Sequence, residues 1–309
     1  MIRKLMLLLV ALAILGGAAF WLLTTPRTLA ASDIPDHTPD LVNGERLFWA
    51  GGCESCHAAA GATGDARFRL GGGLALDTPY GVFNPPNISP DVENGIGSWS
   101  LLDFVNSMKR GIGPGGQHLY PAFPYASYQR MTLPDIIDLK AYLDTLPAVD
   151  DVSRPNELAF PYAIRRGLGL WQLIHIDGET FEPDPEASDI VNRGAYLVEG
   201  PGHCGECHTP RGFDGATIAS LALSGGPPPE GTGRNIPNIT PHETGLGAWS
   251  ESDIVNFLQT GFTPDFDSAG GTMAAVILNT QELPVEDLQA IAAYLKSVPP
   301  IASAAAGGS

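Results

Sequence analysis

Two copies of a short cysteine and histidine motif stand out in the chain. Each copy reads Cys-x-x-Cys-His, and together they use all four cysteines of the protein. A string of this kind should arise by chance only roughly 0.001 times in such a chain. The residues are Cys53, Cys56 and His57 in the first copy and Cys204, Cys207 and His208 in the second. In each copy the two thiols are spaced to add across the two vinyl groups of one haem, and the adjacent histidine reaches the iron. We therefore expect two covalently bound haem c groups, with the two motif histidines as proximal iron ligands.

Cysteine pairs have other interpretations. In an exported protein four cysteines would ordinarily form two disulfides. Cys-x-x-Cys pairs also bind zinc in tetrahedral sites, and they carry out thioredoxin-like redox chemistry. The histidine that follows each pair argues against disulfides, and no βαβ pattern surrounds either pair. We favour covalent haem over zinc and over thioredoxin-like chemistry.

The composition mainly excludes classes of protein. The 309 residues carry 34 acidic and 17 basic side chains, for a formal net charge of −17. A chain with this charge lacks the basic patch that neutralises phosphate, so we expect no nucleic-acid partner. The length predicts about two domains.

The first thirty residues predict a membrane anchor or a signal segment. An uncharged run of 19 residues, from Leu5 to Leu23, follows Arg3 and Lys4. As a helix this run would span about 28 Å, which is enough to cross a bilayer. The charge distribution places the N-terminus in the cytoplasm and the haem domains in the periplasm, anchored to the inner membrane. The alternative is a soluble periplasmic protein, released by cleavage near Ala30.

An internal repeat organises the rest of the chain. The two motifs are 151 residues apart, and Pro86–Pro90 matches Pro237–Pro241 at the same offset. Near the ends of the copies, Leu139–Tyr142 matches Ile291–Tyr294 at an offset of 152. These offsets predict one domain at 40–148 and a second at 188–300, joined by a connector at 149–187 with a docked helix, and followed by a disordered tail at 301–309.

Each copy predicts helices around its motif and loops rich in glycine and proline. Apolar residues with a period near 3.6 indicate a helix before each motif and another at the end of each copy. Gly44 and Gly194 lie on the faces of the helices that precede the motifs, where a small residue lets another helix approach closely. No convincing alternating strand is present. We therefore expect an all-α fold of two tandem domains behind an N-terminal transmembrane helix.

Several strings outside the motifs resemble a known family. They are Asn192–Gly200, Cys207–Arg211 and Tyr120–Tyr125. The chain resembles the multihaem cytochrome c subunits of membrane-bound bacterial dehydrogenases, such as the alcohol and gluconate dehydrogenase cytochromes. The resemblance implies class I cytochrome c-like domains, a dehydrogenase as electron donor, and a terminal oxidase, a quinone or a soluble cytochrome as acceptor. The family typically carries three haems where this chain has cysteines for two, and it usually has Met at the place of Phe123.

The distal iron ligands are harder to predict than the proximal ones. A c-type haem usually has a distal methionine, whose soft sulfur favours ferrous iron. In the second domain Met273 is the candidate, because it precedes the last helix in a Gly-Gly-Thr-Met loop. In the first domain, counting back from the matching tyrosines places Phe123 at the position of the ligand if a gap of two residues is allowed, since Met273 lies 21 residues before Tyr294 and Phe123 lies 19 before Tyr142.

Three alternatives then remain for the distal position of haem 1. We rank Met131 first and His118 second, and an open coordination position third. Met131 aligns with Leu283 and precedes Thr132, a candidate N-cap, so packing at the start of a helix is its competing role. Met108 aligns with an apolar helical position and is expected in the core.

Two prolines and several histidines outside the motifs have weaker predicted roles. Pro86 and Pro237 could each offer a carbonyl oxygen to the proximal imidazole and orient it. His37, His175, His203 and His242 are expected to be surface or linker histidines.

These patterns predict a periplasmic dihaem cytochrome c that carries electrons between a dehydrogenase-type donor and a respiratory acceptor, without itself being an enzyme. The alternative function is a dihaem redox enzyme, of the peroxidase or thiosulfate-oxidising type, with haem 1 as its catalytic centre. The absence of Met at position 123 motivates this alternative.

Overall fold

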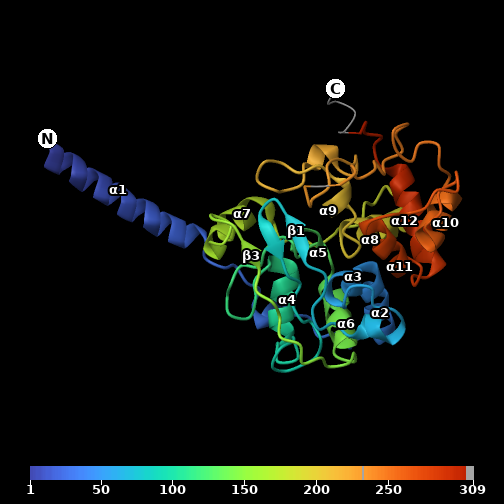
Figure 1. Ribbon diagram of the computed structural model, residues 1–309, viewed down its shortest axis with the longest axis horizontal. Coiled ribbons are helices and arrows are strands. Elements are labelled where there is room, and N and C mark those ends of the chain that lie inside the picture. The colour runs from blue at the N-terminus through green and yellow to red at the C-terminus, as the bar shows by residue number, and fades with distance from the viewer. Residues whose placement is uncertain (232, 304–309) are drawn as a thin grey trace.

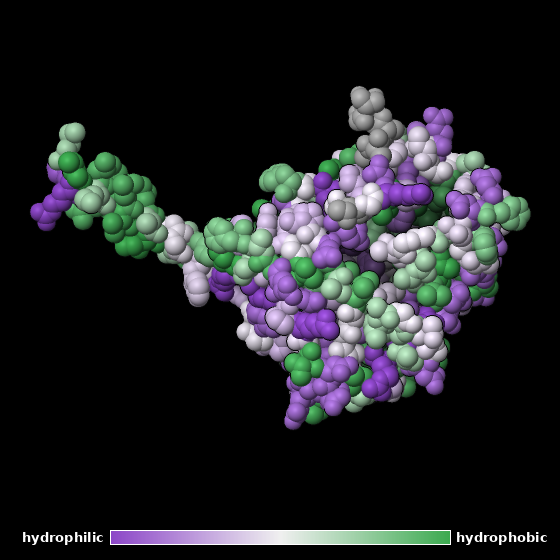
Figure 2. Space-filling view, in the orientation of Figure 1, coloured by the Kyte–Doolittle hydropathy of each residue, from purple (hydrophilic) through white to green (hydrophobic). Residues whose placement is uncertain are grey.

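The computed structural model describes residues 1–231 and 233–303. A single long helix, α1 (Ile2–Leu23), projects from a rounded body that contains the rest of the described chain (Figure 1). Among the described residues, α1 is the one helix that is long and apolar enough to cross a membrane. It is hydrophobic along most of its length, and none of its residues is buried (Figure 2).

The body is built from two helical modules that follow the repeat. Module one contains α2 (Leu41–Ala50), α3 (Cys53–His57), α4 (Leu101–Arg110), α5 (Tyr125–Tyr128) and α6 (Leu133–Leu143). Module two contains α8 (Asp189–Glu199), α9 (Gly205–His208), α10 (Glu251–Thr260), α11 (Thr272–Thr280) and α12 (Val285–Ser297). Four short 3₁₀ turns lie between these helices, at Ala31–Asp33, Gly64–Phe68, Arg165–Gly167 and Ala219–Leu221.

In both modules the helix before the motif crosses the last helix at a glycine. A Cβ atom on Gly44 would lie 2.3 Å from the carbonyl oxygen of Asp138 in α6. A Cβ atom on Gly194 would lie 1.9 Å from the carbonyl oxygen of Ala290 in α12. The expected role of the two glycines is confirmed, since no other residue could allow this approach without a shift of backbone.

The middle helices of the two modules also begin and end alike. Ser100 and Ser250 cap α4 and α10, each accepting a bond from the backbone N–H three residues on, at 3.1 and 3.2 Å. Both helices stop at a glycine in the left-handed region, Gly111 with φ 61° and Gly261 with φ 76°. A capping serine fixes where a helix starts, and a left-handed glycine fixes where it ends.

One continuous hydrophobic core runs through both modules. It includes Leu47, Val105 and Met131 from module one and Leu197 and Leu288 from module two. The modules therefore form one packed body in which each covers part of the other.

The all-α expectation holds only in part, because the body also contains a small antiparallel sheet. Its strands are β1 (Leu76–Thr78), β2 (Gly81–Phe83) and β3 (Glu157–Leu158), paired in that order. Pro79 and Tyr80 make the turn between the first two strands, and Gly81, which has φ 123°, begins the second. Strands of two or three residues are too short to show an alternating pattern, which explains why the sequence did not reveal them.

The connector carries α7 (Leu168–His175), at the place where a docked helix was expected. Gln172 donates to the carbonyl oxygen of Gly111 in module one at 3.0 Å, and Trp171 donates to the carbonyl oxygen of Asp214 in module two at 3.2 Å. The helix thus contacts both modules.

The start of the expected tail is held by module two. The backbone N–H of Ile301 donates to the Thr240 hydroxyl at 3.2 Å, and that of Ser303 donates to the Thr244 hydroxyl at 3.0 Å. The remainder of the predicted disordered segment, 304–309, lies outside the described residues.

Candidate haem sites

The two motifs fold into short helices, α3 and α9, directly after the helices that the two glycines position. The residue before the first cysteine has a left-handed backbone in both copies: Gly52 has φ 55° and His203 has φ 39°. This sharp turn aims each motif helix back across the end of the helix before it. A histidine is strained in the left-handed region and a glycine is not. The turn at His203 therefore has a higher conformational free energy than the turn at Gly52.

The proximal histidines are oriented in the same way in both modules. His57 Nδ1 lies 2.7 Å from the carbonyl oxygen of Pro86, and His208 Nδ1 lies 2.8 Å from that of Pro237. The proline carbonyls considered from the sequence are therefore in place. Because a carbonyl oxygen only accepts, Nδ1 carries the proton and the lone pair is on Nε2, which is the atom that a haem iron would bind. Burial lowers the pKa of both histidines, against the opposite effect of the carbonyl bond, and this favours the neutral imidazole that ligation requires.

The four thiols are free and held in their neutral form. Burial raises the pKa of Cys53 and of Cys204 to about 12 and that of Cys207 to about 11, and it also raises the pKa of Cys56. None of the four forms a disulfide. Zinc would need four converging donors, and residues 1–231 and 233–303 hold no group of three or more His, Cys, Asp or Glu side chains that could bind a metal ion. Paired thiols on one short helix, beside an imidazole with a free Nε2, fit covalent haem.

The two motifs lie next to each other across the module interface. Cys56 is among the groups that raise the pKa of Cys207, after burial as the main cause. The rings of Tyr128 and His203 are 5.6 Å apart between the motifs. His203 was expected on the surface or in a linker; it is instead half-buried at this interface, where its ring packs on Tyr128 and desolvation lowers its pKa.

Matching bonds clamp each motif to the other module. Ser127 in module one donates to Glu206 in the second motif at 3.2 Å. The equivalent residue of module two, Asn279, donates to Ser55 in the first motif at 2.8 Å. Ser55 and Glu206 occupy the same position of their motifs, so the same kind of contact is made in both directions across the interface.

A buried carboxylate strengthens one side of this interface. Glu54 is 7% exposed and receives bonds from Arg67 at 3.2 Å and from Asn279 at 3.1 Å. Arg67 also donates to Glu282 of module two at 2.9 Å. A charge at this burial is stable only when it is paired and hydrogen-bonded, as here.

The distal segments, which follow α4 and α10, show where the two modules differ. Leu119 and Ala269 make the same backbone bond to the glycines that end these helices, which sets an offset of 150. The last helices begin after Thr132 and Pro284, which sets an offset of 152. The two extra residues of module two fall between these points. Met131 holds the place of Leu283, because both make the same backbone bond before the last helix, whereas Phe123 and Met273 lie within the segment that differs in length.

The structure places the two methionine candidates in different surroundings. Met273 lies in the first turn of α11, half-buried against the core. Met131 is 0% exposed, and its Cγ lies 3.8 Å from where a Cβ on Gly200 of module two would stand. Thr132 caps α6 by accepting the Asp135 N–H at 3.2 Å, as expected.

His118 is held away from any ligand role by its own bonds. It is 3% exposed, with Nδ1 lying 2.5 Å from Gln172 Oε1 and Nε2 lying 2.8 Å from the carbonyl oxygen of Thr24. Both nitrogens would have to break these bonds before either could reach an iron. Through these two bonds His118 connects module one to α7 and to the end of α1.

Two residues near the motifs were missed in the sequence. Tyr128 is buried close to Cys53 and Cys56, and burial together with these thiols raises its pKa well above the ordinary value. Lys109 is buried at the end of α4 and donates to the carbonyl oxygens of Gln129 and Met131. A lysine at a helix end is usually on the surface, so no pattern in the sequence marks this one.

Two helical modules that each present paired thiols and an oriented proximal histidine define a tandem c-type cytochrome. The sequence profile of the cytochrome c family matches residues 41–147 and 191–299, and the chain belongs to this family, with two covalently bound haem c groups.

The relatives of the chain agree with the resemblance seen in the sequence. It is 50% identical over 291 residues to a diheme cytochrome c-type protein of Cereibacter sphaeroides, covering 94% of this chain and 97% of that protein. It is 38% identical to the cytochrome c subunit of an alcohol dehydrogenase (quinone) of Gluconacetobacter polyoxogenes, covering 93% of this chain and 61% of the subunit. It is 36% identical to the cytochrome c subunit of gluconate 2-dehydrogenase of Pantoea cypripedii, covering 82% and 58%. The chain thus spans less than two thirds of the two dehydrogenase subunits.

Proposed function

We propose that the protein is a membrane-anchored dihaem cytochrome c that carries electrons from a dehydrogenase-type donor to a respiratory acceptor. The observation that carries this proposal is the contact between the two motifs, where Tyr128 packs on His203 and Cys56 lies near Cys207. Two haems attached at these positions are held close together by one rigid core. The dehydrogenase partner is suggested by the relatives, and the acceptor is a terminal oxidase, a quinone or a soluble cytochrome.

Each haem supplies an iron that cycles between the ferric and ferrous states. The chain holds this chemistry in place without making or breaking a bond in a substrate. Pro86 and Pro237 fix the imidazole planes and keep the proton on Nδ1, so that Nε2 stays available. The continuous core packs against Cys53 and Cys204 and so supplies apolar surroundings on one side of each site.

The proposal includes α1 as a retained anchor in the inner membrane, with the N-terminus in the cytoplasm and both modules in the periplasm. Its length and apolar surface suit this role, and Arg3 and Lys4 lie at the end expected to stay inside. The proposed domain limits remain 40–148 and 188–300, joined by the connector at 149–187.

For the distal positions we propose Met273 at haem 2 and Met131 at haem 1. Met273 lies in the first turn of α11, which is the helix that precedes the last helix, α12, so the loop expected at this place is helical. Met131 is favoured in module one because the nitrogens of His118 are bonded elsewhere and Met108 lies on the buried face of α4. The replacement Met131→Leu tests this directly, since module two has Leu at the same place. Loss of low-spin haem 1 in the variant would support ligation, and an unchanged spectrum would overturn it.

The function is tested by a reductive titration and by rapid mixing with a reduced donor cytochrome. We expect two one-electron steps and fast exchange between two low-spin haems that do not bind added cyanide or carbon monoxide. Slow or absent exchange between the haems would contradict an electron carrier.

A second candidate function is favoured by one observation, namely that the segment 119–130 of module one contains no methionine, whereas the corresponding segment of module two contains Met273. If haem 1 lacks a distal protein ligand, the chain is a dihaem redox enzyme of the peroxidase or thiosulfate-oxidising type. A high-spin haem 1 that turns over peroxide or thiosulfate would establish this function instead.

A further inference from the structure

The end of α1 is joined to the body by a set of specific bonds. Thr24, which ends the helix, is 0% exposed. Its carbonyl oxygen faces His118 Nε2 at 2.8 Å, and its hydroxyl accepts a bond from Arg166 Nε at 2.8 Å. Arg166 also donates to the carbonyl oxygen of Trp21 at 2.8 Å and lies 4.2 Å from the centre of its ring. Gly169 of α7 leaves the space for Thr24, since a Cβ there would lie 2.7 Å from Thr24 Cβ.

These bonds at Trp21 and Thr24, called the joint below, attach the end of the helix directly to the body. The 22 residues of α1 make a helix of about 33 Å, close to the roughly 30 Å thickness of the hydrocarbon core of a bilayer. Because the next residue is already buried in the body, a membrane that contains α1 must lie directly against the surface around the joint.

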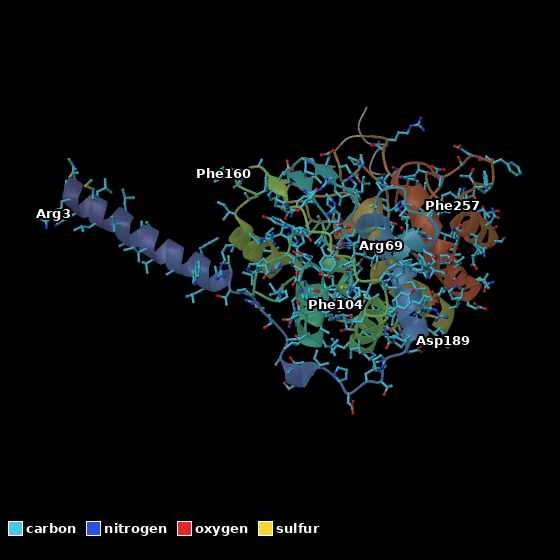
Figure 3. The ribbon with its side chains drawn as sticks, turned by 60° about the horizontal axis from the view of Figure 1, so that its bottom comes forward. Arg3, Arg69, Phe104, Phe160, Asp189 and Phe257 are labelled. Carbon is cyan, nitrogen blue, oxygen red and sulfur yellow. The ribbon has the colours of Figure 1, made fainter. Side chains whose placement is uncertain are left out.

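The surface around the joint has an apolar part that suits such contact. Figure 1 places α7 beside the C-terminal end of α1, and Figure 3 shows Phe160 on the side of the body from which α1 emerges. Exposed apolar side chains of the connector are Phe160, Tyr162, Ile164, Leu170, Leu173 and Ile174. Phe160 is 82% exposed and Ile174 is 74% exposed, and several exposed apolar side chains in one segment are typical of an interaction surface.

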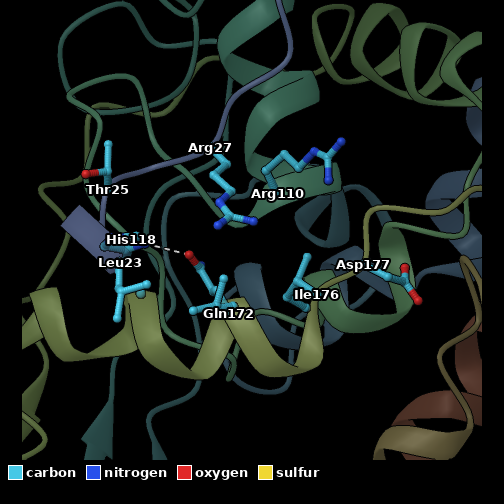
Figure 4. Close-up of a pocket in the computed structure, with 10 residues that line it drawn as sticks. Leu23, Thr25, Arg27, Arg110, His118, Gln172, Ile176 and Asp177 are labelled. Carbon is cyan, nitrogen blue, oxygen red and sulfur yellow. Dashed lines mark hydrogen bonds between the residues drawn. The ribbon is translucent and has the colours of Figure 1, made fainter. Parts of the chain in front are cut away.

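The same surface holds a small cavity with two arginines in it. The cavity has a volume of about 80 Å³ and lies between the end of α1, the end of α4 and α7. In Figure 4, Arg27 and Arg110 enter it from the side opposite α7. Within residues 1–231 and 233–303 neither arginine forms a hydrogen bond or an ion pair, and Arg110 Nε is buried without a partner. The one carboxylate in the lining, Asp177, is already bonded to Arg130 at 3.1 Å.

We propose that this cavity binds the phosphodiester group of an anionic phospholipid from the membrane that holds α1. Arginine pairs strongly with phosphate oxygens through parallel N–H bonds, which would satisfy the unpartnered Arg110 and Arg27. The apolar residues of the lining, Leu23, Leu173 and Ile176, provide a path for the acyl chains toward the bilayer. Two unpaired arginines are notable in a chain of net charge −17. The inference rests on the proposed retention of α1.

The test uses the full-length holoprotein in mild detergent, delipidated and observed by native mass spectrometry. Phosphatidylglycerol, phosphatidylcholine with the same acyl chains, and inorganic phosphate are added separately. We expect one phosphatidylglycerol per chain, bound about tenfold more tightly than phosphatidylcholine and not displaced by excess inorganic phosphate. The double variant Arg27→Gln/Arg110→Gln should lose about tenfold or more of this affinity. Arg234→Gln, an exposed arginine of module two, is the matched control and should bind as the wild type does.

Haem content and spectra, measured on each variant, show that it has folded. Equal affinity for the two lipids, unchanged binding by the double variant, or displacement by inorganic phosphate would each overturn the inference. N-terminal sequencing of the mature protein distinguishes its failure from that of the proposed electron transfer. A mature chain that begins near Ala31 would refute the lipid site, while the titration of the two haems would still decide the electron-transfer function.

Discussion

Modules one and two share their proximal sides and differ on their distal sides. The motif turn, the proline carbonyl on the histidine and the glycine crossing are the same in both. The distal segment of module one is short, because α5 has four residues, and it is covered by the connector, where the rings of Tyr125 and Trp171 are 6.1 Å apart. The distal segment of module two contains the nine residues of α11, with Val276 and Leu278 exposed.

This difference shows which parts of a haem module can vary. The residues that orient the proximal histidine are fixed by backbone geometry, so both copies keep them. The distal segment only has to cover the side of the haem site opposite the proximal histidine. It packs against different elements in the two modules. Both distal segments contact the motif of the other module, and that of module one is joined in addition to the connector and α1.

The largest effect is expected from removing one pair of thiols. We expect Cys204→Ala/Cys207→Ala and Cys53→Ala/Cys56→Ala each to retain one covalent haem per chain, because the proximal sides are equivalent and separate. Denaturing mass spectrometry and the pyridine haemochromogen spectrum measure this. Loss of both haems from either variant would show that the two sites do not mature independently.

A methyl group at either glycine crossing should destabilise the fold by about 2–3 kcal/mol or more, because it meets backbone that cannot move aside cheaply. We expect Gly194→Ala to cost more than Gly44→Ala, since its Cβ would lie 1.9 Å rather than 2.3 Å from a carbonyl oxygen. Denaturant unfolding followed by circular dichroism gives the free energies. Gly167→Ala is the control, because nothing lies within 4 Å of its Cβ position, and a cost there equal to that at the crossings would refute the steric explanation.

These crossings also show what the sequence could predict. The repeat aligned the motifs, the glycines and the prolines, and each of these acts through local backbone geometry that a short string encodes. The contact between modules was not predictable, because His203, Tyr128 and Glu206 meet only after both copies have folded. The sheet was missed because its strands are two or three residues long. His118 was ranked second as a ligand because it is one of few donors in module one, and its bonds to Thr24 and Gln172 were not predictable because these residues are far away in the chain.

The variant Met273→Ala tests whether the distal segment of module two supplies an iron ligand. Loss of a thioether ligand should lower the reduction potential of haem 2 on the order of a hundred millivolts, because the methionine sulfur stabilises ferrous iron. Spectropotentiometric titration resolves the two haems. Met108→Ala removes a buried methionine of α4 that is 3% exposed and should reduce stability while leaving both potentials in place. Equal potentials in Met273→Ala and the wild type would remove the ligand assignment.

Lys109 should make the stability of module one depend on pH. Burial, with help from Arg110 and Arg130, lowers its pKa from 10.5 to about 8. Below pH 8 the lysine is protonated in both the folded and the unfolded chain, so the cost of burying its charge is fully present. Between about pH 8 and 10.5 the folded chain releases the proton first, so the free energy of unfolding should rise with pH.

The slope is measured by comparing the wild type with Lys109→Met at several pH values in this window. The equivalent residue of module two is the exposed Gln259, and Gln259→Met should give no change in slope. The same slope in the wild type and in Lys109→Met would show that the lysine is not the titrating group.

The smallest effects are expected at the paired interface bonds. Ser127→Ala should cost about 1 kcal/mol, because it removes one hydroxyl bond to Glu206. Asn279→Ala should cost more, since Asn279 donates to both Ser55 and the buried Glu54. Arg67 still pairs with Glu54 in that variant, so the carboxylate is not left alone. Chemical denaturation measures both, and the double variant should show nearly additive costs because the two contacts share no residue. A larger cost for Ser127→Ala than for Asn279→Ala would contradict the view that the interface is stronger on the side of the first motif.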